Sequence, residues 1–479
     1  MAKSMDENIN EKGNACAEVG IPFCVHLITL GCDKNRVDSE VMLARLVGTG
    51  RFTPTHDPAK ADVIIVNTCG FIREATQESI DTILEMATHK TDPDTPCRGL
   101  VITGCMSERY RDDAKNAIPE ADAILGVKDT DTIVQVVLEL MGDVSPAAAL
   151  YDTKGDPGQL RALSRSYFHA GHVAHVKISD GCDNACTYCT IPSIRGAYTS
   201  RPVEEIVAEC EVLINSGARE LVLVAQDTAL YGVDLYGEPR LHLLIRAIAA
   251  LPGQPWIRLM YAYPEHITPE IIQAIANLPN VCKYIDMPIQ HSETSVLTRM
   301  GRRSTRESLH VLIRELREKI PGIALRTTLM VGFPGETVED FRGLYNFIKE
   351  IRFDRLGVFP YSREEGTPAA IMPRQVKEEA KHTRRDRLMR LQQKIHQERQ
   401  QAKIGQTIYV MVDECLEDDA LRAQFPTKQL YIGRTQHDAY EVDAVVRFAS
   451  SSPLSPGDIA QVSITGADEY DLQGVQAQQ

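Results

Sequence analysis

The sequence lacks a long apolar segment. No uninterrupted apolar run in its 479 residues approaches the roughly 18 residues that a membrane-spanning helix needs. The first twenty residues, MAKSMDENINEKGNACAEVG, also lack the apolar core of a secretory signal and carry acids and amides instead. We therefore expect a cytoplasmic protein and not a membrane protein.

Positive charge is also in short supply. The chain has 52 Lys and Arg residues against 66 Asp and Glu residues, a formal net charge of −14. Proteins that bind nucleic acid over their whole surface neutralise phosphates with Lys and Arg, so the balance disfavours that class and favours a basic partner. The apolar fraction of 43% and charged fraction of 25% are ordinary for a soluble globular protein. At about 150 residues per domain, the length predicts about three domains.

Cysteine is plentiful, with twelve residues in the chain. Thiols in the cytosol are kept reduced, so a disulfide framework is not expected there. Metal or redox chemistry is the leading interpretation of so many cysteines.

Three segments in the first third of the chain share one pattern. VHLITLGC, ADVIIVNTC and RGLVITGC each run from β-branched apolar residues to a cysteine beside small residues, and predict buried strands that end at Cys32, Cys69 and Cys105. Helical patterns at residues 37–47 and 75–87 separate them, so a parallel α/β sheet is expected. The carboxyl ends of such strands meet at one crevice, where three thiols would gather. The alternative is that each cysteine is a small buried apolar residue.

The rest of the chain divides into further units. Residues 143–170 are rich in Pro, Gly and Ser and predict a linker. Beyond them, helical patterns such as residues 203–216 and 339–351 alternate with strands, which predicts a partial parallel (β/α) barrel. The expected strands are HVAHVKIS, ELVLVAQ, WIRLMYA, KYIDMPI, IALRTTLMV and RLGVFPY.

The last quarter changes character twice. Residues 374–403 carry ten basic and four acidic side chains and predict a long polar helix, which is expected to be a solvated connector, with a basic docking face as the alternative. After Gly405 the runs QTIYVMVDE, LYIGRT, DAYEVDAVVRF and DIAQVSITGA predict a small antiparallel β-barrel. The expected domains are an α/β domain at 22–142, a linker at 143–167, the partial barrel at 168–400 and the β-barrel at 401–475.

The strongest chemical motif is a group of three cysteines at Cys182, Cys186 and Cys189, in the text CDNACTYC after the strand HVKIS. Three thiolates in so short a loop can hold one compact metal centre. Structural zinc is almost always closed by four ligands, whereas three cysteines leave one iron of a 4Fe–4S cluster open to bind a substrate. Zinc with His172 or His175 as fourth ligand is the alternative.

This loop resembles the C-x-x-x-C-x-x-C motif of the radical S-adenosylmethionine enzymes. In that superfamily the cluster binds the amino and carboxylate groups of S-adenosylmethionine, and one electron cleaves the sulfonium to give a 5′-deoxyadenosyl radical. The resemblance places Tyr188 near the adenine, with core packing as its alternative role. Arg326 and Gly332, in RTTLMVGFPGET, are further candidates for cofactor binding, although Gly332 and Gly335 before Glu336 also suit a plain turn from strand to helix.

The resemblance narrows to the methylthiotransferase family when the first three cysteines and the terminal β-barrel are added, and it covers about residues 24–474. In this family Cys32, Cys69 and Cys105 would hold a second 4Fe–4S cluster that handles the sulfur to be inserted, and the terminal barrel is called the TRAM domain. The resemblance assigns no catalytic side chain besides these ligands. It leaves six cysteines without a role, namely Cys16, Cys24, Cys97, Cys210, Cys282 and Cys415.

Some family members modify the adenosine next to the anticodon of transfer RNA, and the RimO branch modifies an aspartate of ribosomal protein S twelve. The chain resembles the RimO branch in LGCDKN, where the transfer-RNA branch typically has GCQMN, and in DMPIQH, where that branch typically has HLPVQSGS. Asp33 is a departure, because RimO chains more often carry proline there. Lys34 and Asn35 fit.

The resemblance implies a division of work between two clusters. The cluster at Cys182, Cys186 and Cys189 would generate the radical that removes a β-hydrogen from the target aspartate, and the other cluster would deliver sulfur. A second S-adenosylmethionine would supply the methyl group. An electron donor such as a flavodoxin and a sulfur donor are the further partners, and transfer RNA is a partner only under the alternative substrate.

Charge in the β-barrel offers a physical check on the substrate. Residues 404–479 hold twelve acidic and four basic side chains, a net charge of −8. This sign suits a basic ribosomal protein better than a phosphate backbone, although the acids could serve solubility alone. Two other classes of protein are possible. An iron–sulfur electron carrier would give no role to the partial (β/α) barrel or to the terminal β-barrel. A zinc-stabilised RNA-binding scaffold is disfavoured by the acidic charge of the terminal β-barrel.

Overall fold

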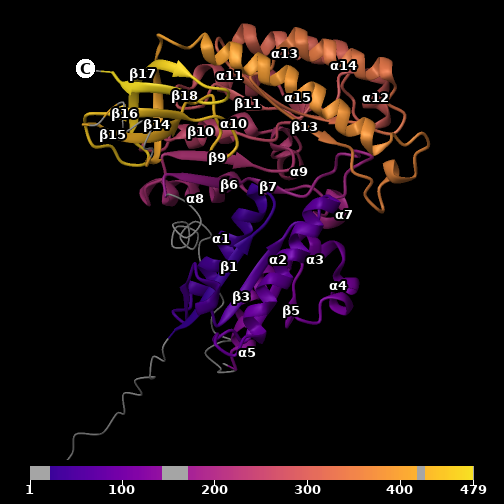
Figure 1. The fold of residues 1–479 in the computed structure, drawn as a ribbon, viewed down its shortest axis with the longest axis vertical. Coiled ribbons are helices and arrows are strands. Elements are labelled where there is room, and N and C mark those ends of the chain that lie inside the picture. Colours follow the sequence, from indigo (N-terminus) through magenta and orange to yellow (C-terminus); the bar gives the residue numbers. More distant parts are fainter. Residues whose placement is uncertain (1–21, 143–170, 418–424, 426, 478–479) are drawn as a thin grey trace, which may run out of the picture.

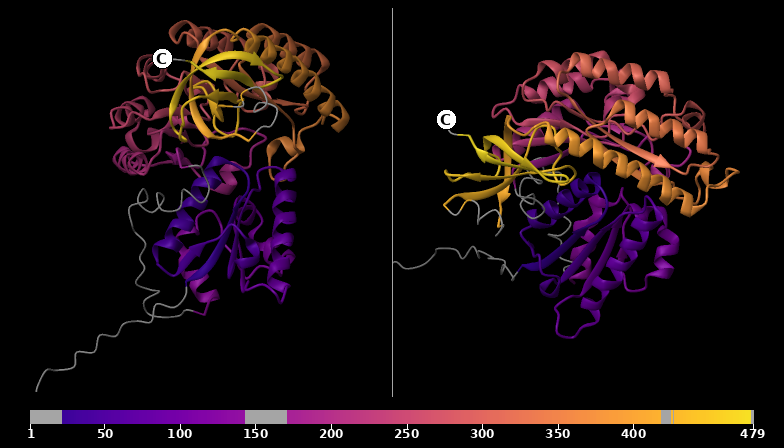
Figure 2. Two further views of the ribbon diagram at one scale, coloured as in Figure 1. Left: turned by 60° about the vertical axis from the view of Figure 1, so that its left-hand side comes forward. Right: turned by 45° about the horizontal axis from the view of Figure 1, so that its top comes forward.

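The protein is described here from a computed structural model, which places residues 22–142, 171–417, 425 and 427–477 (Figure 1). The predicted linker at 143–170 lies outside the described residues. Within the described part, no helix is both long and apolar enough to cross a membrane. An N-terminal α/β unit lies below a larger α/β unit, and the C-terminal barrel flanks the larger unit (Figures 1 and 2).

The N-terminal unit contains the predicted parallel sheet. Its strand order is β2-β1-β3-β4-β5, and every pair is parallel. Two short strands at the edges, β2 and β5, were not predicted. The strands are β1 (Phe23–Thr29), β2 (Phe52–Pro54), β3 (Val63–Thr68), β4 (Gly99–Gly104) and β5 (Ala123–Ile124). The helices are α1 (Asp33–Gly48), α2 (Arg73–Thr91), α3 (Cys105–Arg109), α4 (Arg111–Ala117) and α5 (Ile133–Leu140).

Both faces of this sheet are covered, because β3 is apolar at every one of its first four positions. Val63 and Ile65 belong to a core shared with α1 and α5, whereas Ile64 and Val66 belong to a second core shared with α2. Side chains alternate between the faces of a strand, so a continuous apolar run fits a sheet buried on both sides. The helices therefore fix the sheet from both sides and leave its carboxyl edge for the cysteines.

The larger unit is a partial barrel whose six main strands match the six predicted runs. Two parallel three-stranded sheets, β6-β9-β10 and β11-β12-β13, are joined by a parallel bridge between Ile257 and Val281. The strands are β6 (Val173–Lys177), β9 (Glu220–Val224), β10 (Trp256–Leu259), β11 (Tyr284–Asp286), β12 (Ala324–Val331) and β13 (Arg355–Pro360). A short antiparallel pair, β7 (Ser179–Asp180) with β8 (Thr199–Ser200), flanks the second cysteine loop.

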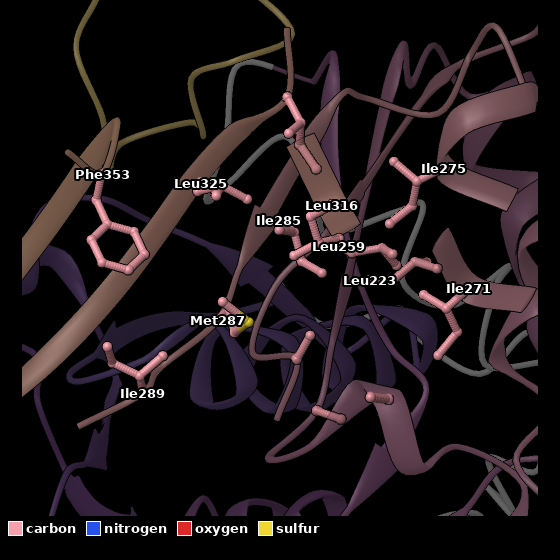
Figure 3. Close-up of a cluster of buried hydrophobic side chains, with 14 of the residues drawn as sticks. Leu223, Leu259, Ile271, Ile275, Ile285, Met287, Ile289, Leu316, Leu325 and Phe353 are labelled. Carbon is pink, nitrogen blue, oxygen red and sulfur yellow. The ribbon is translucent and has the colours of Figure 1, made fainter. Parts of the chain in front are cut away.

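Helices cover the outside of the partial barrel, and the core lies between them and the strands. Figure 3 shows Leu223, Leu259, Ile285 and Leu325, one from each of four strands, in one buried cluster with Ile271 of a covering helix, which lies beside Leu223. The helices are α7 (Ile191–Arg195), α8 (Val203–Asn215), α9 (Val233–Tyr236), α10 (Leu241–Ala249), α11 (Pro269–Asn277), α12 (Thr294–Arg299), α13 (Arg306–Lys319) and α14 (Val338–Ile351).

The long polar helix is present as α15 (Glu378–Gln401), but the prediction of a solvated connector is wrong for one of its faces. Leu388 and Ile395 are buried in the barrel core, and the Gln392 side-chain amide donates to the Phe353 carbonyl. Apolar residues are too sparse in this segment to reveal the buried stripe. The helix lies along the open side of the barrel, beside β13 (Figure 1).

The C-terminal unit is a closed barrel of order β14-β15-β16-β18-β17. The strands are β14 (Thr407–Cys415), β15 (Gln429–Arg434), β16 (Val446–Ser450), β17 (Ile459–Ala467) and β18 (Leu472–Gln476). The predicted strand DAYEVDAVVRF is wrong in its first half, because residues 438–445 form turns and extended loop. Those residues carry Asp438 and Asp443, whose carboxylates bind the larger unit. Strand β18 was not predicted.

Candidate metal centres

The first three cysteines lie at the carboxyl edge of the N-terminal sheet. Cys69 follows β3, Cys105 begins α3 directly after β4, and Cys32 is the residue before α1. Each cysteine has a glycine beside it in the chain. The strand ends therefore deliver all three thiols to one edge, as the sequence predicts.

The glycines are required for this approach. Gly31 has φ of +91°, and a Cβ atom there would lie 2.8 Å from Cys69 Cβ and 2.9 Å from its Sγ. A Cβ at Gly70 would lie 2.6 Å from the Met106 backbone, and one at Gly104 would lie 2.5 Å from the Thr68 carbonyl oxygen. Only glycine lets the backbone of one loop lie so close to the next.

Burial disfavours the charged form of these thiols. It raises the pKa of Cys105 to about 11, against the opposing effect of the Arg195 guanidinium, and it also raises the pKa of Cys69. A bound cationic centre would reverse this preference, because coordinating thiols are deprotonated. The pKa of Cys69 and that of Cys105 both respond to the charge of Cys32, so the three side chains form one electrostatic group.

The second group of cysteines lies in the loop between β7 and α7. The Cys189 N–H donates to the Cys186 carbonyl, and the Thr187 N–H donates to the Met300 carbonyl, 3.0 Å away. The Ile191 N–H in turn donates to Cys189 Sγ at 3.4 Å. Burial raises the pKa of Cys189 to about 12 and that of Cys182 to about 11. The loop is thus held in place by backbone hydrogen bonds, with Cys182 buried and Cys186 and Cys189 half-buried.

Both groups suit an iron–sulfur centre by their chemistry. Soft thiolate ligands select iron–sulfur clusters, zinc or Cu(I). Among the described residues, no three Cys, His, Asp or Glu side chains converge as they would around a single metal ion. Cysteine thiolates are the usual ligands of a 4Fe–4S cluster. By donor type, the set at Cys32, Cys69 and Cys105 and the set at Cys182, Cys186 and Cys189 each suit one such cluster.

The two histidines considered as zinc ligands are engaged elsewhere. His172 Nε2 lies 2.8 Å from Asp413 in the C-terminal barrel, and both side chains are buried. His175 Nε2 lies 3.7 Å from Asp33 in the N-terminal unit. Each histidine thus lies at a junction between domains and not in the Cys182 loop.

Tyr188 is buried and meets Phe333 edge to face, with ring centroids 6.3 Å apart. Gly332, at φ of +75°, donates its N–H to the Glu336 carboxylate, which also accepts from the Phe333 N–H at 3.1 Å. Arg326 Nη1 lies 2.7 Å from Asp286. Tyr188 lies in the loop between β7 and α7, whereas Arg326 lies near the start of β12 and Gly332 directly follows that strand. The role of these three residues in cofactor binding stays a prediction.

Arg195, which the sequence analysis missed, joins the two cysteine groups. Its guanidinium is nearly fully buried, lies 2.9 Å from Asp180 and 3.0 Å from Asp38, and donates to Asn35 at 2.6 Å. It also donates to Cys105 Sγ at 3.5 Å. In the sequence, its nearness to the Cys182 loop, six residues after Cys189, was the only indication that Arg195 could belong to the site.

Two tyrosines after β10 were also missed. The Tyr263 hydroxyl lies 3.1 Å from Cys186 Sγ, and the Arg302 guanidinium covers the Tyr263 ring, 3.7 Å from its centroid. The Tyr261 hydroxyl donates to Asp33, 3.0 Å away. Burial raises the pKa of both tyrosines well above the usual range, so both stay protonated. The strand end YAYP therefore reaches both cysteine groups.

The acids of the C-terminal barrel point partly inward. Asp413 lies 2.8 Å from Arg434, which itself lies 2.7 Å from Glu220 of β9. The Tyr284 hydroxyl donates to Asp443 at 2.8 Å. Glu441 lies 2.7 Å from Arg36 of the N-terminal unit. These acids join domains, so the net charge of the barrel overstates what it offers to a partner.

Three sequence models of known families match the chain in order. "Uncharacterized protein family UPF0004" matches residues 24–126, "Radical SAM superfamily" matches residues 176–348, and "TRAM domain" matches residues 404–476. Each match falls on one of the three units described above. The solved radical S-adenosylmethionine methyltransferase TsrM from Kitasatospora setae has a similar fold, with TM-score 0.52 and 16% identity over 73% of this chain and 75% of that chain.

Similarity to curated proteins extends over nearly the whole chain. The ribosomal protein uS12 methylthiotransferase RimO of Desulforamulus reducens is 45% identical over 95% of this chain and 99% of its own length. The protein of the same name from Geobacter sulfurreducens is 46% identical over 94% of this chain and 98% of its own length. The chain therefore belongs to the family of radical S-adenosylmethionine methylthiotransferases named RimO.

Proposed function

We propose that this chain transfers a methylthio group to the β-carbon of an aspartate in ribosomal protein uS12. The relatives that are named for this activity are similar to the chain over nearly their full length. The observation that carries the proposal is the joining of two three-cysteine groups by Arg195 and by the segment that holds Tyr261 and Tyr263. Replacing an unactivated C–H bond needs radical formation and sulfur delivery at neighbouring places, and this junction provides them.

Two clusters and S-adenosylmethionine supply the chemistry when bound: reductive cleavage of the sulfonium at Cys182, Cys186 and Cys189, and sulfur at Cys32, Cys69 and Cys105. The protein's own residues bind and orient these groups. We assign Tyr188, Arg326 and Gly332 to the S-adenosylmethionine side of the site. The Tyr263 hydroxyl contacts Cys186 Sγ, and we assign to the buried Arg195 the role of holding the two cysteine groups at a fixed spacing.

The reaction also requires partners and a compartment. One electron must reach the Cys182 loop for each cleavage, so we propose a protein electron donor of the flavodoxin kind. Sulfur that leaves with the product must be replaced by a separate donor. Because the substrate is a ribosomal protein, we place the enzyme in the cytoplasm.

The test is an anaerobic reaction of the reconstituted protein with S-adenosylmethionine, reductant, sulfide and recombinant uS12, followed by intact-protein mass spectrometry. A mass gain of one methylthio group on uS12 supports the proposal. Formation of 5′-deoxyadenosine without that gain would contradict the proposed substrate and direct the same assay to transfer RNA. Absence of 5′-deoxyadenosine would contradict the radical chemistry.

A further inference from the structure

Lys34 is a buried cation beside the first cysteine group. It follows Cys32 by two positions in the first turn of α1, and only 7% of the residue is exposed. Its ammonium lies over the Tyr261 ring, 3.2 Å from the centroid. Tyr261 packs at the edge of an apolar cluster built from Val37 of the N-terminal unit, strands of the larger barrel and Ala439 of the C-terminal barrel. Lys34 thus lies where three domains meet.

Neighbouring cations at this junction have carboxylate partners, but Lys34 has none within 4 Å in the described part of the chain. Lys177 lies 2.5 Å from Asp38 and 2.8 Å from Asp180, and Arg195 binds the same two acids. The carboxylate of Asp33, next to Lys34 in sequence, is engaged with the Tyr261 hydroxyl and His175. It also interacts with the Lys34 ammonium through its charge, but forms no ion pair with it within 4 Å.

A buried charge without a close carboxylate is costly, and an aromatic ring offsets part of that cost. A desolvated cation–π contact is worth about 2 kcal/mol, which is less than the several kcal/mol that removing an ammonium from water costs. The contact also leaves the donor hydrogens of the ammonium that face away from the ring available to another group. The charge of Lys34 is therefore only partly compensated by the described residues around it.

We infer that Lys34 binds the carboxylate of the target aspartate, an inference that rests on the proposed function. The aspartate brings one negative charge to the junction between the two cysteine groups. Tyr261, beneath the ammonium, is two residues from Tyr263, which touches Cys186. A carboxylate on Lys34 therefore lies beside the strand end that reaches both cysteine groups.

The residue type agrees with the charge of the substrate. Lys34 lies in the text LGCDKN, two residues after Cys32. An adenine base is neutral and carries no carboxylate, whereas an ammonium suits an acid. Lys34 thus selects an acidic side chain and disfavours a nucleobase.

The test is a double-mutant cycle measured by equilibrium binding of uS12 to the full-length, cluster-loaded protein. The enzyme variants are Lys34→Met, which keeps the side-chain volume, and Lys34→Arg, which keeps the charge. The substrate variant replaces the target aspartate, located by mass spectrometry, with asparagine. Lys60→Met is the matched control, because Lys60 is exposed and forms a surface ion pair with Asp57, three positions earlier, at 3.1 Å.

Loss of one charge-assisted contact weakens binding by about 10- to 100-fold. Lys34→Met should show this loss of affinity with unaltered uS12. The asparagine substrate should show a similar loss with the unaltered enzyme. When the Lys34→Met enzyme is combined with the asparagine substrate, the loss should be smaller than the sum of the two separate losses. Lys34→Arg should recover part of the affinity. In turnover, Lys34→Met should raise the KM for uS12 and the amount of 5′-deoxyadenosine formed per methylthio product.

Two results would overturn the inference and spare the proposed function. One is that the aspartate and asparagine substrates bind equally well to the unaltered enzyme, while that enzyme methylthiolates uS12. This comparison does not depend on whether an enzyme variant folds. The other is additive losses in the cycle, which would assign Lys34 to a different anion such as sulfide. Failure of the unaltered enzyme to modify uS12 would overturn the proposed function and the inference together.

Discussion

Tyr261 and Tyr263 stand two residues apart after β10 and contact different cysteine groups. The Tyr261 hydroxyl donates to Asp33 beside Cys32, and the Tyr263 hydroxyl lies 3.1 Å from Cys186 Sγ. One short segment therefore joins the two cysteine groups, to which we assign sulfur delivery and radical formation. In the proposed function the two groups form one active site, although they come from separate domains.

The division of work between the groups predicts different losses for two variants. Cys186→Ala should abolish cleavage of S-adenosylmethionine, because that thiol belongs to the loop assigned to radical formation. Cys69→Ala should keep cleavage and stop sulfur insertion. Chromatography of 5′-deoxyadenosine and mass spectrometry of uS12 measure the two steps. The exposed Cys415→Ala is the control, and equal loss of cleavage in both folded variants would contradict the division.

The close approach of the first cysteine loops predicts a steric effect at Gly31. Gly31→Ala should lower the iron and sulfide content of the reconstituted protein toward half, because its Cβ would collide with Cys69. Gly50→Ala is a matched control, since Gly50 also has positive φ, +69°, but a Cβ there meets nothing within 4 Å. Similar iron content in the two variants would show that backbone strain, and not the contact with Cys69, decides the result.

The buried ion pairs of Arg195 predict a large loss of stability. Arg195→Met would leave Asp38 and Asp180 without one of their cations, and breaking a buried pair typically costs about 3–5 kcal/mol. Urea denaturation measures the free energy of unfolding. The same substitution at the more exposed Arg352, which pairs with Glu398, should cost no more than about 1 kcal/mol. Equal costs at the two positions would contradict a junction held by Arg195.

Acid should loosen the C-terminal barrel from the larger unit. Burial alone would raise the pKa of Glu220, but Arg258 and Arg434 lower it to about 2, below the ordinary value of 4.5. The folded state therefore binds this proton less readily than the unfolded state. Its stabilising contribution is present above pH 4.5 and is lost as the pH falls toward 2.

The one tryptophan of the chain, Trp256, pairs with Glu220 in adjacent strands and reports on this junction by fluorescence. The unaltered protein should lose stability as the pH falls from 4.5 to 2. Glu220→Gln should be less stable at neutral pH and lose less over the same window. Glu238→Gln, which alters an exposed pair, should behave as the unaltered protein does. Identical acid profiles for all three proteins would assign the acid sensitivity to other groups.

The cysteine groups and the main strands could be predicted because their information is local. Apolar runs ending at Cys32, Cys69 and Cys105 fix both the strands and the edge where the thiols meet. The short edge strands β2 and β5 and the strand β18 carry few apolar residues and gave no comparable signal. The buried face of α15 was missed because Leu388 and Ile395 are isolated in a strongly charged segment.

The residues that join the domains could not be predicted, because their partners are far away in sequence. Arg195 binds Asp38 across 157 positions, and Tyr261 donates to Asp33 across 228 positions. The barrel acids were correctly counted, but Asp413 and Asp443 serve domain junctions, which composition cannot distinguish from a surface that attracts a partner.

Methylthiolation of uS12 can be read from the intact mass of recombinant uS12 after anaerobic incubation with the reconstituted protein, S-adenosylmethionine, reductant and sulfide. We expect a gain of one methylthio group, located on an aspartate by fragmentation. An unchanged uS12 mass, while 5′-deoxyadenosine accumulates, would contradict this expectation.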